Sequence, residues 1–468
     1  MRRPASIRGW PLSIKPLTGV RSLNSVPMKP DISFLKLTGI SPAQRSRLLQ
    51  RTESELSPYL DKVKPIIAAV RAEGDAALAR FAGIFDKAPL TAGTIAATPA
   101  DFARAHAALE PDVLEAITYA AANIAKFYQR QEPAETWTEE ISPGVFAGDR
   151  TLPIPSAACY IPRGKGSFPS SVMMTCIPAS VAGVPDICII TPPGPDGNID
   201  AATLVAAEAA GVSKVYKAGG AQGIAAVAYG TQTIARYAKV IGPGSPWVVA
   251  AKRLLSDQID TGTPAGPSES IIFADATTDG RLAALDLLIE AEHGEDSSAF
   301  IVTTSEEVAR AALAAIPEYW SRMRAQRVAY TQAVLSSSRG GILIARDVEE
   351  AFAFINDYAP EHLQILSKEP RGYLPLVKHA GEVLLGEYTP STLANFVVGP
   401  SHVLPTGGWA RTYSALSVHD FMKRTSVAEV TRGGYAEQAR HARVIARYEG
   451  FDAHANAVSA LRDRLLGN

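Results

Sequence analysis

Three short apolar segments in the middle of the chain each run into a glycine-rich turn that precedes a helix-forming segment. The strand–helix pairs are residues 187–191 with 201–210, 214–218 with 222–229, and 240–241 with a helix ending near residue 255. Repetition of strand, turn and helix in this order is typical of a parallel, doubly wound α/β sheet. Because ligands of such sheets bind at the carboxyl ends of the strands, the glycine-rich turns mark the expected binding edge. No Gly-x-Gly-x-x-Gly motif follows these strands, so the usual dinucleotide fingerprint is absent.

A second alternating block follows the first. Strands are predicted over residues 270–274, 300–303, 341–344 and 362–367, with helices over 279–294 and 349–358. The flanking regions differ from these blocks. Helical periodicity covers residues 43–88, with a break at Gly74, and residues 100–131, whereas 137–141 and 144–151 are typical of strands, and residues 434–466 predict two helices separated at Gly450.

Composition excludes several classes of function. The net charge is -1, so the chain has no electrostatic footprint for nucleic acid or an anionic membrane. No apolar run is long enough to span a bilayer. The three cysteines, Cys159, Cys176 and Cys188, indicate buried thiols in a reducing, cytoplasmic protein rather than a disulfide framework.

The first thirty residues contain basic side chains and no acidic one. Such a segment is typical of an organellar transit peptide, or it precedes a true start at Met28. On either interpretation, residues 1–30 are expected to lie outside the fold.

The predicted helix over residues 279–294 carries a potential metal site. Asp279 is the expected N-cap, and Gly294 the expected left-handed end. Glu290 and His293 are three residues apart, so they project side by side. A carboxylate and an imidazole at this spacing can occupy two corners of a zinc site, although a capping histidine beside a solvated glutamate is the simpler alternative.

Other histidines lie beside turns, where functional residues concentrate. Glu361 and His362 are adjacent at the expected end of a helix, where a glutamate could activate water and a histidine could take a hydroxyl proton. A capped helix end with a solvated glutamate is the alternative. His402 lies in a Gly/Pro-rich loop, and His454 follows Glu449 near a helix break.

Several long and specific motifs follow one another along the chain. They are Tyr160-Ile161-Pro162-Arg163-Gly164-Lys165, Gly219-Gly220-Ala221-Gln222-Gly223, Gly266-Pro267-Ser268-Glu269, Ala291-Glu292-His293, Tyr358-Ala359-Pro360-Glu361-His362 and His402-Val403-Leu404-Pro405-Thr406-Gly407-Gly408. In this order they resemble the histidinol dehydrogenase family, and the resemblance extends from about residue 45 to the C-terminus.

The resemblance implies a zinc-containing, NAD-dependent homodimer that oxidises a small primary alcohol through an aldehyde to a carboxylate with two NAD. The implied α/β fold has two Rossmann-like domains with parallel sheets and a helical C-terminal tail exchanged between subunits. The expected divisions are 1–30, 31–158 (helical segment and part of the first domain), 159–267 (nucleotide side), 268–416 (metal and catalytic residues) and 417–468 (tail).

The resemblance also implies roles for individual residues. His362 would take the alcohol proton, and Glu361 would activate water for the aldehyde step. The expected substrate pocket consists of Ser268, His402, Glu449 and Ser391, and the nucleotide would be bound by Tyr160, Gln222 and Ser245.

The metal set departs from the family pattern at two positions. Glu290 stands where the family has Gln, and Asn395 stands where it has Asp. The two exchanges together keep one carboxylate, one amide and two histidines, so they are interpreted as compensating. The predicted zinc ligands are Glu290, His293 and His454, with Asn395 weakly bound or replaced by water, because an amide oxygen is a poorer zinc ligand.

Further departures concern the substrate and the cofactor. Ser391 stands where the family has an acidic residue that would suit a cationic amino alcohol, and Ser245 replaces an Asn. Arg163 and Lys165 could face an anionic group or be ordinary surface charges. Three interpretations therefore stay open: a dehydrogenase of this family with a substrate other than histidinol, histidinol dehydrogenase itself, or a non-catalytic relative that binds a nucleotide.

Overall fold

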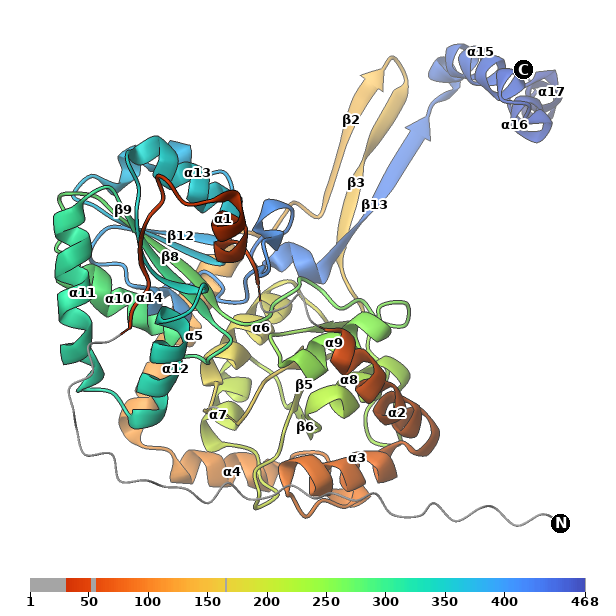
Figure 1. The fold of residues 1–468 in the computed structure, drawn as a ribbon. Helices are drawn as coiled ribbons and strands as arrows, with labels where there is room; N and C mark the ends of the chain where they lie inside the picture. The colour runs from red at the N-terminus through yellow and green to blue at the C-terminus, as the bar shows by residue number, and fades with distance from the viewer. Residues whose placement is uncertain (1–30, 52–55, 165, 468) are drawn as a thin grey trace.

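The computed structural model describes residues 31–51, 56–164 and 166–467, so the expectations for residues 1–30 and Lys165 lie outside the described residues (Figure 1). The body contains two parallel sheets, as the two alternating blocks predict. The first sheet has the order β6-β5-β4-β7. Its strands are β4 (Ala157–Tyr160), β5 (Ile187–Thr191), β6 (Lys214–Lys217) and β7 (Lys239–Ile241).

Helices cover both faces of the first sheet. Along β4, Cys159 packs into one apolar cluster with α6 and α7, whereas Ala158 and Tyr160 pack into the other with α8 and α9. This alternation is the two-residue period of a strand buried on both faces. The helices are α2 (Ser57–Glu73), α3 (Asp75–Phe81), α4 (Pro99–Ala108), α5 (Pro111–Gln129), α6 (Pro169–Val181), α7 (Ala201–Ala209), α8 (Gly220–Tyr229) and α9 (Pro246–Leu254).

The second sheet has six strands in the order β1-β10-β9-β8-β11-β12. They are β1 (Phe34–Lys36), β8 (Glu269–Ala274), β9 (Ser298–Thr303), β10 (Gly340–Ile344), β11 (His362–Leu366) and β12 (Glu382–Leu385). The helices around this sheet are α1 (Pro42–Leu48), α10 (Gly280–Ala291), α11 (Glu306–Trp320), α12 (Ala325–Leu335), α13 (Val348–Tyr358) and α14 (Ser391–Phe396).

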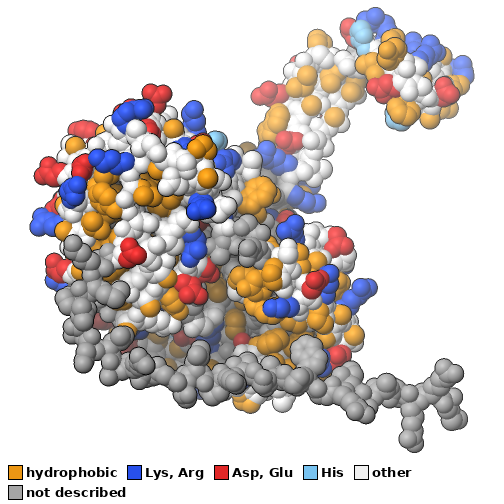
Figure 2. Space-filling model, viewed as in Figure 1, with side chains coloured by type: hydrophobic (Ala, Val, Ile, Leu, Met, Phe, Trp, Pro, Cys, Tyr) orange, Lys and Arg blue, Asp and Glu red, His pale blue; other side chains and the backbone are white. Residues whose placement is uncertain are grey.

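A third, antiparallel sheet forms an arm that projects from the body (Figure 1). Its strands are β2 (Thr136–Ser142), β3 (Val145–Pro153) and β13 (Met422–Val430), and it leads to α15 (Arg432–Tyr448), α16 (Asp452–Ala457) and α17 (Ala460–Leu466). Apolar side chains remain exposed along it, including Tyr448 at 94% and Leu465 at 88% (Figure 2).

Four sequence predictions need correction. The tail 417–468 is not wholly helical, because β13 pairs with β3 along nine residues. Residues 100–131 form two helices, since Pro111 starts a new one at its favoured first position. The helical region after Gly450 is divided again before α17. Finally, β1 pairs with β10, so residues 34–36 extend the second sheet rather than the first.

Two other expectations are confirmed. Gly74 separates α2 from α3 with φ +59°, a conformation that favours glycine. The three cysteines are free and buried, and burial raises the pKa values of the Cys176 and Cys188 thiols. None of the helices that the structure describes is long and apolar enough to cross a lipid bilayer.

Candidate active site

The adjacent acid and imidazole lie at the amino end of β11. Helix α13 ends at Tyr358, and Ala359 adopts a left-handed conformation with φ +53°, which turns the chain sharply into the strand. His362 is then the first residue of β11. Both side chains are buried, with Glu361 6% and His362 4% exposed. The turn allows these two adjacent side chains to reach one site, because adjacent residues on a regular helix or strand point in different directions.

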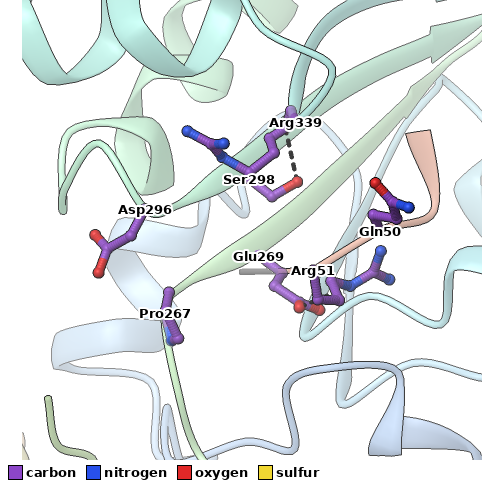
Figure 3. Close-up of a pocket in the computed structure, with 7 residues that line it drawn as sticks. All are labelled: Gln50, Arg51, Pro267, Glu269, Asp296, Ser298 and Arg339. Carbon is purple, nitrogen blue, oxygen red and sulfur yellow. Dashed lines mark hydrogen bonds and ion pairs between the residues drawn. The ribbon is translucent and has the colours of Figure 1, made fainter. Parts of the chain in front are cut away.

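A buried ion pair supports this turn. The Arg51 guanidinium stacks 3.3 Å from the centre of the Tyr358 ring, donates to the Tyr358 carbonyl at 2.5 Å, and lies 2.8 Å from the Glu269 carboxylate. The Glu269 backbone N–H donates to Glu361 Oε2 at 2.9 Å. Figure 3 shows the Glu269 carboxylate beside the Arg51 side chain in a small pocket that is also lined by Gln50, Pro267, Asp296, Ser298 and Arg339.

Helix α10 brings a second acid to this edge. Asp279 caps the helix as predicted, through a bond from the Arg281 N–H. The predicted end at Gly294 is wrong, because α10 ends at Ala291 and Gly294 is not left-handed. The predicted proximity of Glu290 and His293 is confirmed, since Glu290 Oε2 lies 3.2 Å from His293 Nδ1.

The two departures from the family pattern meet in the structure. The Asn395 side-chain amide donates to Glu290 Oε1 at 2.8 Å, and the Ser391 side chain also hydrogen-bonds Glu290. Both residues lie on α14 and are buried. The exchanged acid and amide are therefore direct neighbours, as a compensating pair requires.

His362 is surrounded by three carboxyl groups. Its Nε2 lies 4.0 Å from Glu290 Oε1 and 3.7 Å from Glu361 Oε2, and its Nδ1 lies 2.6 Å from Glu382 Oε1. Sequence reasoning missed Glu382. The only signal available was its place as the first residue of an apolar strand, where a buried charge needs a partner.

The buried acids and the imidazole shift one another's pKa values. Burial would raise the pKa of Glu290, but His362, His293 and the Asn395 bond hold it below its usual range. Burial and the nearby Glu290 raise the pKa of Glu361 well above its usual range, although His362 opposes this. Burial lowers the pKa of His362, but Glu290 and Glu361 outweigh it and raise the pKa to about 10. Opposite shifts in two neighbouring carboxyl groups are typical of acid–base sites.

His402 connects the two halves of the body. Its Nδ1 lies 2.8 Å from the Asn395 carbonyl oxygen, and its Nε2 lies 3.2 Å from Ser171 Oγ on α6. Burial lowers the pKa of His402 to about 4, so the ring is neutral at pH 7. Since α6 follows β4, the amino edge of the second sheet faces the carboxyl edge of the first across this loop.

The expected nucleotide residues gather at that carboxyl edge. Tyr160 ends β4, and its hydroxyl accepts a bond from the Gly220 N–H at 3.2 Å. Gln222 is buried in the first turn of α8, and Ser245 precedes α9 after β7. The strand order reverses between β4 and β7, which is where doubly wound sheets bind their ligands.

Glu290, His293 and Asn395 supply part of a donor set for zinc. Within the described residues, no three His, Cys, Asp or Glu side chains are grouped so that they could hold a metal ion. Glu290 and His293 supply two such donors, and Asn395 Oδ1 is buried with no hydrogen-bond partner in the described part of the chain. Glu290 is 1% exposed and has no Lys or Arg partner among the described ion pairs. A buried carboxylate beside an amide oxygen without a hydrogen-bond partner fits a cation site that needs one more protein ligand.

The tail residues are not part of this cluster within one chain. Glu449 caps α15 and His454 lies on α16, and both are exposed on the arm (Figure 1). Ser268 immediately precedes β8, next to Glu269. Arg163 donates to the Asn198 carbonyl at 3.3 Å, beside the first sheet rather than beside His362. The functional roles of these residues stay predictions.

Comparison with known proteins supplies the family. Residues 49–462 match the family model described as histidinol dehydrogenase. A "Histidinol dehydrogenase homolog 2" of Mesorhizobium japonicum is 58% identical over 93% of this chain and 99% of its own length. A "Histidinol dehydrogenase" of Synechocystis sp. is 46% identical over 92% and 99%.

A crystal structure of histidinol dehydrogenase from Elizabethkingia anophelis superposes with a TM-score of 0.86 at 32% identity, covering 94% of this chain and 99% of that one. These matches confirm the predicted fold class, apart from the exchange of the tail, which a single chain does not test. The chain belongs to the histidinol dehydrogenase family, the NAD-dependent oxidoreductases that oxidise an alcohol CH–OH group to an acid.

Proposed function

We propose that the protein is a zinc-containing dehydrogenase that oxidises the CH2OH group of a small molecule other than histidinol. The observation that carries this proposal is the buried group of Glu361, His362 and Glu290 at an edge that faces the expected nucleotide residues. A non-catalytic relative would have no need for three ionisable groups that are buried together at a cost in folding free energy.

The side chains divide the chemistry between them. A cation bound beside Glu290 would offset the charge that contributes to the raised pKa values of His362 and Glu361. In that state the neutral His362 takes the hydroxyl proton of the alcohol at Nε2, and the ionised Glu361 takes a proton from water as that water adds to the aldehyde. Bound NAD would supply the hydride acceptor for each of the two oxidations. Zinc bound beside Glu290 would orient the substrate hydroxyl and offset the carboxylate charge as a Lewis acid. His402, neutral at pH 7, donates its Nδ1 proton to the Asn395 carbonyl, so its Nε2 can accept a hydrogen bond from the substrate.

The substrate is proposed to differ from histidinol because of Ser391. This residue is buried against Glu290, at the position where the resemblance places an acid for a cationic amino group. A serine there leaves such a cation without its counter-charge, which would be costly in a buried pocket. The names of the relatives agree with this: the "Histidinol dehydrogenase homolog" of Rhizobium meliloti is 55% identical to this chain, whereas the "Histidinol dehydrogenase" of Synechocystis sp. is 46% identical.

The exposed arm is proposed to cross to a second copy of the chain. Val444, Ile445 and Phe451 are each more than half exposed, and they lie on the tail with Glu449 and His454. Apolar surface of this kind marks an interface. In the proposed homodimer, Glu449 of the partner subunit would enter the substrate pocket and His454 of the partner subunit would fill the open corner beside Glu290 and His293.

Substrate choice is tested by following NADH formation with zinc-loaded protein on a panel of hydroxymethyl compounds that includes L-histidinol. We expect weak or no turnover of L-histidinol and robust turnover of another member. Efficient turnover of L-histidinol at low concentration would instead establish the second candidate, histidinol dehydrogenase itself. The intact Glu361-His362 pair and the Synechocystis relative favour that candidate over a purely nucleotide-binding role.

Subunit exchange is tested by mixing two inactive variants. His454→Ala and His362→Asn would each inactivate their own homodimers, for different reasons. After the subunits are mixed and re-associated, half of the sites in a heterodimer would combine an intact His362 with an intact His454 of the partner subunit. Recovered NADH formation is the expected result. If no activity returns although heterodimers form, the tail does not complete the site in trans.

A further inference from the structure

Glu382 makes the shortest contact to the proposed catalytic base. Its Oε1 lies 2.6 Å from His362 Nδ1, whereas the other ring nitrogen, Nε2, lies 3.7 Å from Glu361 Oε2. A neutral imidazole carries one N–H and one lone pair, and the hydrogen bond made by one nitrogen decides the state of the other. When the His362 ring is in its neutral form, a carboxylate at Nδ1 keeps the proton there and leaves the lone pair on Nε2, on the side of Glu361 and Glu290.

The backbone fixes this carboxylate in place. β12 pairs with β11 in parallel, with Glu382 directly opposite His362, and the Glu382 N–H donates to the Glu361 carbonyl at 3.0 Å. At the preceding position a Cβ would lie 2.6 Å from the Glu361 carbonyl oxygen, so only Gly381 lets the strands approach this closely. A shift of one residue would turn Glu382 to the opposite face of the sheet.

The burial of Glu382 argues against a purely structural ion pair. Its side chain is 8% exposed, and His362 is its only partner among the described ion pairs. Burying a carboxylate without an Arg or Lys partner costs folding free energy. Its presence beside His362 therefore indicates a role in the chemistry of the site. By contrast, Glu387, five residues later, pairs with Lys368 at 2.5 Å and is 20% exposed.

We propose that Glu382 is a positioning residue that sets the ring orientation and the tautomer of His362 for removal of the alcohol proton. The inference rests on the proposed function, because it takes His362 as the base of that reaction. Glu382 is the one partner of His362 Nδ1 among the hydrogen bonds of the described residues. Glu382 lies at Nδ1, on the other side of the ring from the Nε2 that faces Glu361 and Glu290, so we expect no contact with the substrate. It acts through His362, so it should affect the rate of proton removal and leave substrate binding nearly unchanged.

The contact is tested without substrate, by proton NMR of the zinc-loaded protein. A nitrogen-bound proton shared with a buried carboxylate resonates far downfield of the amide protons. We expect such a resonance in the wild type, and its loss in both Glu382→Gln and His362→Asn. Its absence from the wild type would overturn the proposal, even if Glu382→Gln failed to fold.

The function of the contact is tested by steady-state kinetics with the alcohol that the panel turns over fastest. Glu382→Gln should lower kcat by at least about 10-fold with KM nearly unchanged, since groups that orient a functional histidine are worth about this much or more. Glu382→Asp, which keeps the charge on a shorter side chain, should recover part of kcat, and the control Glu387→Gln should behave as the wild type.

Equal kcat values for Glu382→Gln and Glu387→Gln would overturn the inference while the proposed function stands. If the wild type oxidises no alcohol but shows the downfield proton, the proposed function fails and the contact itself remains.

Discussion

The expected functional residues of the two parallel sheets lie at opposite edges. In the first sheet, the expected nucleotide residues follow β4, β6 and β7, at the carboxyl ends of the strands. In the second sheet, His362 and Glu382 are the first residues of β11 and β12, and Glu290 lies in the last turn of α10, the helix that leads back toward the start of β9. The usual rule for open α/β sheets places ligands at carboxyl ends, so it describes the first sheet and not the second.

The difference follows from what each edge contributes. The first edge offers glycine turns and helix N-termini, where backbone N–H groups suit the phosphates of a dinucleotide. The second offers ionisable side chains that burial and proximity have shifted. Because the edges face each other across His402, one supplies the proposed cofactor surface and the other the proposed acid–base chemistry.

The largest expected effect is that of His362→Asn on the rate of alcohol oxidation, which this variant should separate from nucleotide binding. This change should reduce alcohol oxidation by about 10³-fold, within the range for loss of a general base, and leave the Kd for NAD unchanged. NADH formation and NAD titration measure the two quantities. His379→Asn, which changes a histidine outside the cluster, is the control. An unchanged oxidation rate would show that another group is the base or that the protein is not catalytic.

The next effect concerns the exchanged acid and amide. Glu290→Gln removes the carboxylate of the proposed metal set and should weaken zinc binding by at least about 100-fold, as judged from the cost of lesser changes around metal ligands. Adding Asn395→Asp restores one carboxylate and one amide, so the double variant should recover most of the zinc. Metal analysis after loading and dialysis measures this. Equal zinc in the wild type and the single variant would contradict the compensating exchange.

A smaller effect is expected at the first edge. Gly220 has φ +55°, and a Cβ there would lie 2.8 Å from the Gln222 side-chain oxygen. Gly220→Ala should therefore displace Gln222 and raise the KM for NAD by about 10-fold, with zinc content unchanged, if that oxygen contributes a hydrogen bond of roughly 1.4 kcal/mol. Gly211→Ala is a matched control, since Gly211 has φ +76° but open space around the added atom.

A last effect, on stability rather than on activity, tests the support beneath the second edge. Burial raises the pKa of Asp286 to about 6, although the Gln364 amide donates to it at 2.7 Å. The folded state therefore holds a proton that the unfolded state releases from about pH 4, so stability is lost as the pH rises to about 6. Asp286→Asn should gain stability relative to the wild type across this window, by on the order of 2 kcal/mol, and keep a constant advantage above it. Thermal unfolding at several pH values measures the difference, and a pH-independent difference would contradict it.

Local sequence patterns predicted the two sheets well because their strands are short apolar runs bounded by turns. They predicted secondary structure less well where pairing between distant segments determines it. Residues 422–430 carry no strong strand signal and form β13 only because β3 lies beside them. Gly294 looked like a helix end, but α10 stops three residues earlier, and the chain turns there without a left-handed residue.

The candidate site was predicted in part for the same reason. Spacing brought Glu290 to His293, and the family resemblance placed Asn395 beside them. Glu382 could not be found from spacing, because its contact with His362 depends on the register between β11 and β12. In a single chain, His454 lies on α16 at the end of the arm, away from Glu290 (Figure 1). Its proposed role as a ligand therefore depends on the partner subunit.

The most direct test of the account is anomalous diffraction at the zinc edge from crystals of the zinc-loaded protein. We predict one strong peak per subunit, in contact with Glu290 and His293, within reach of Asn395, and completed by His454 of the partner subunit. A structure of the loaded protein with no peak beside Glu290, or with both histidines directed elsewhere, would contradict the account.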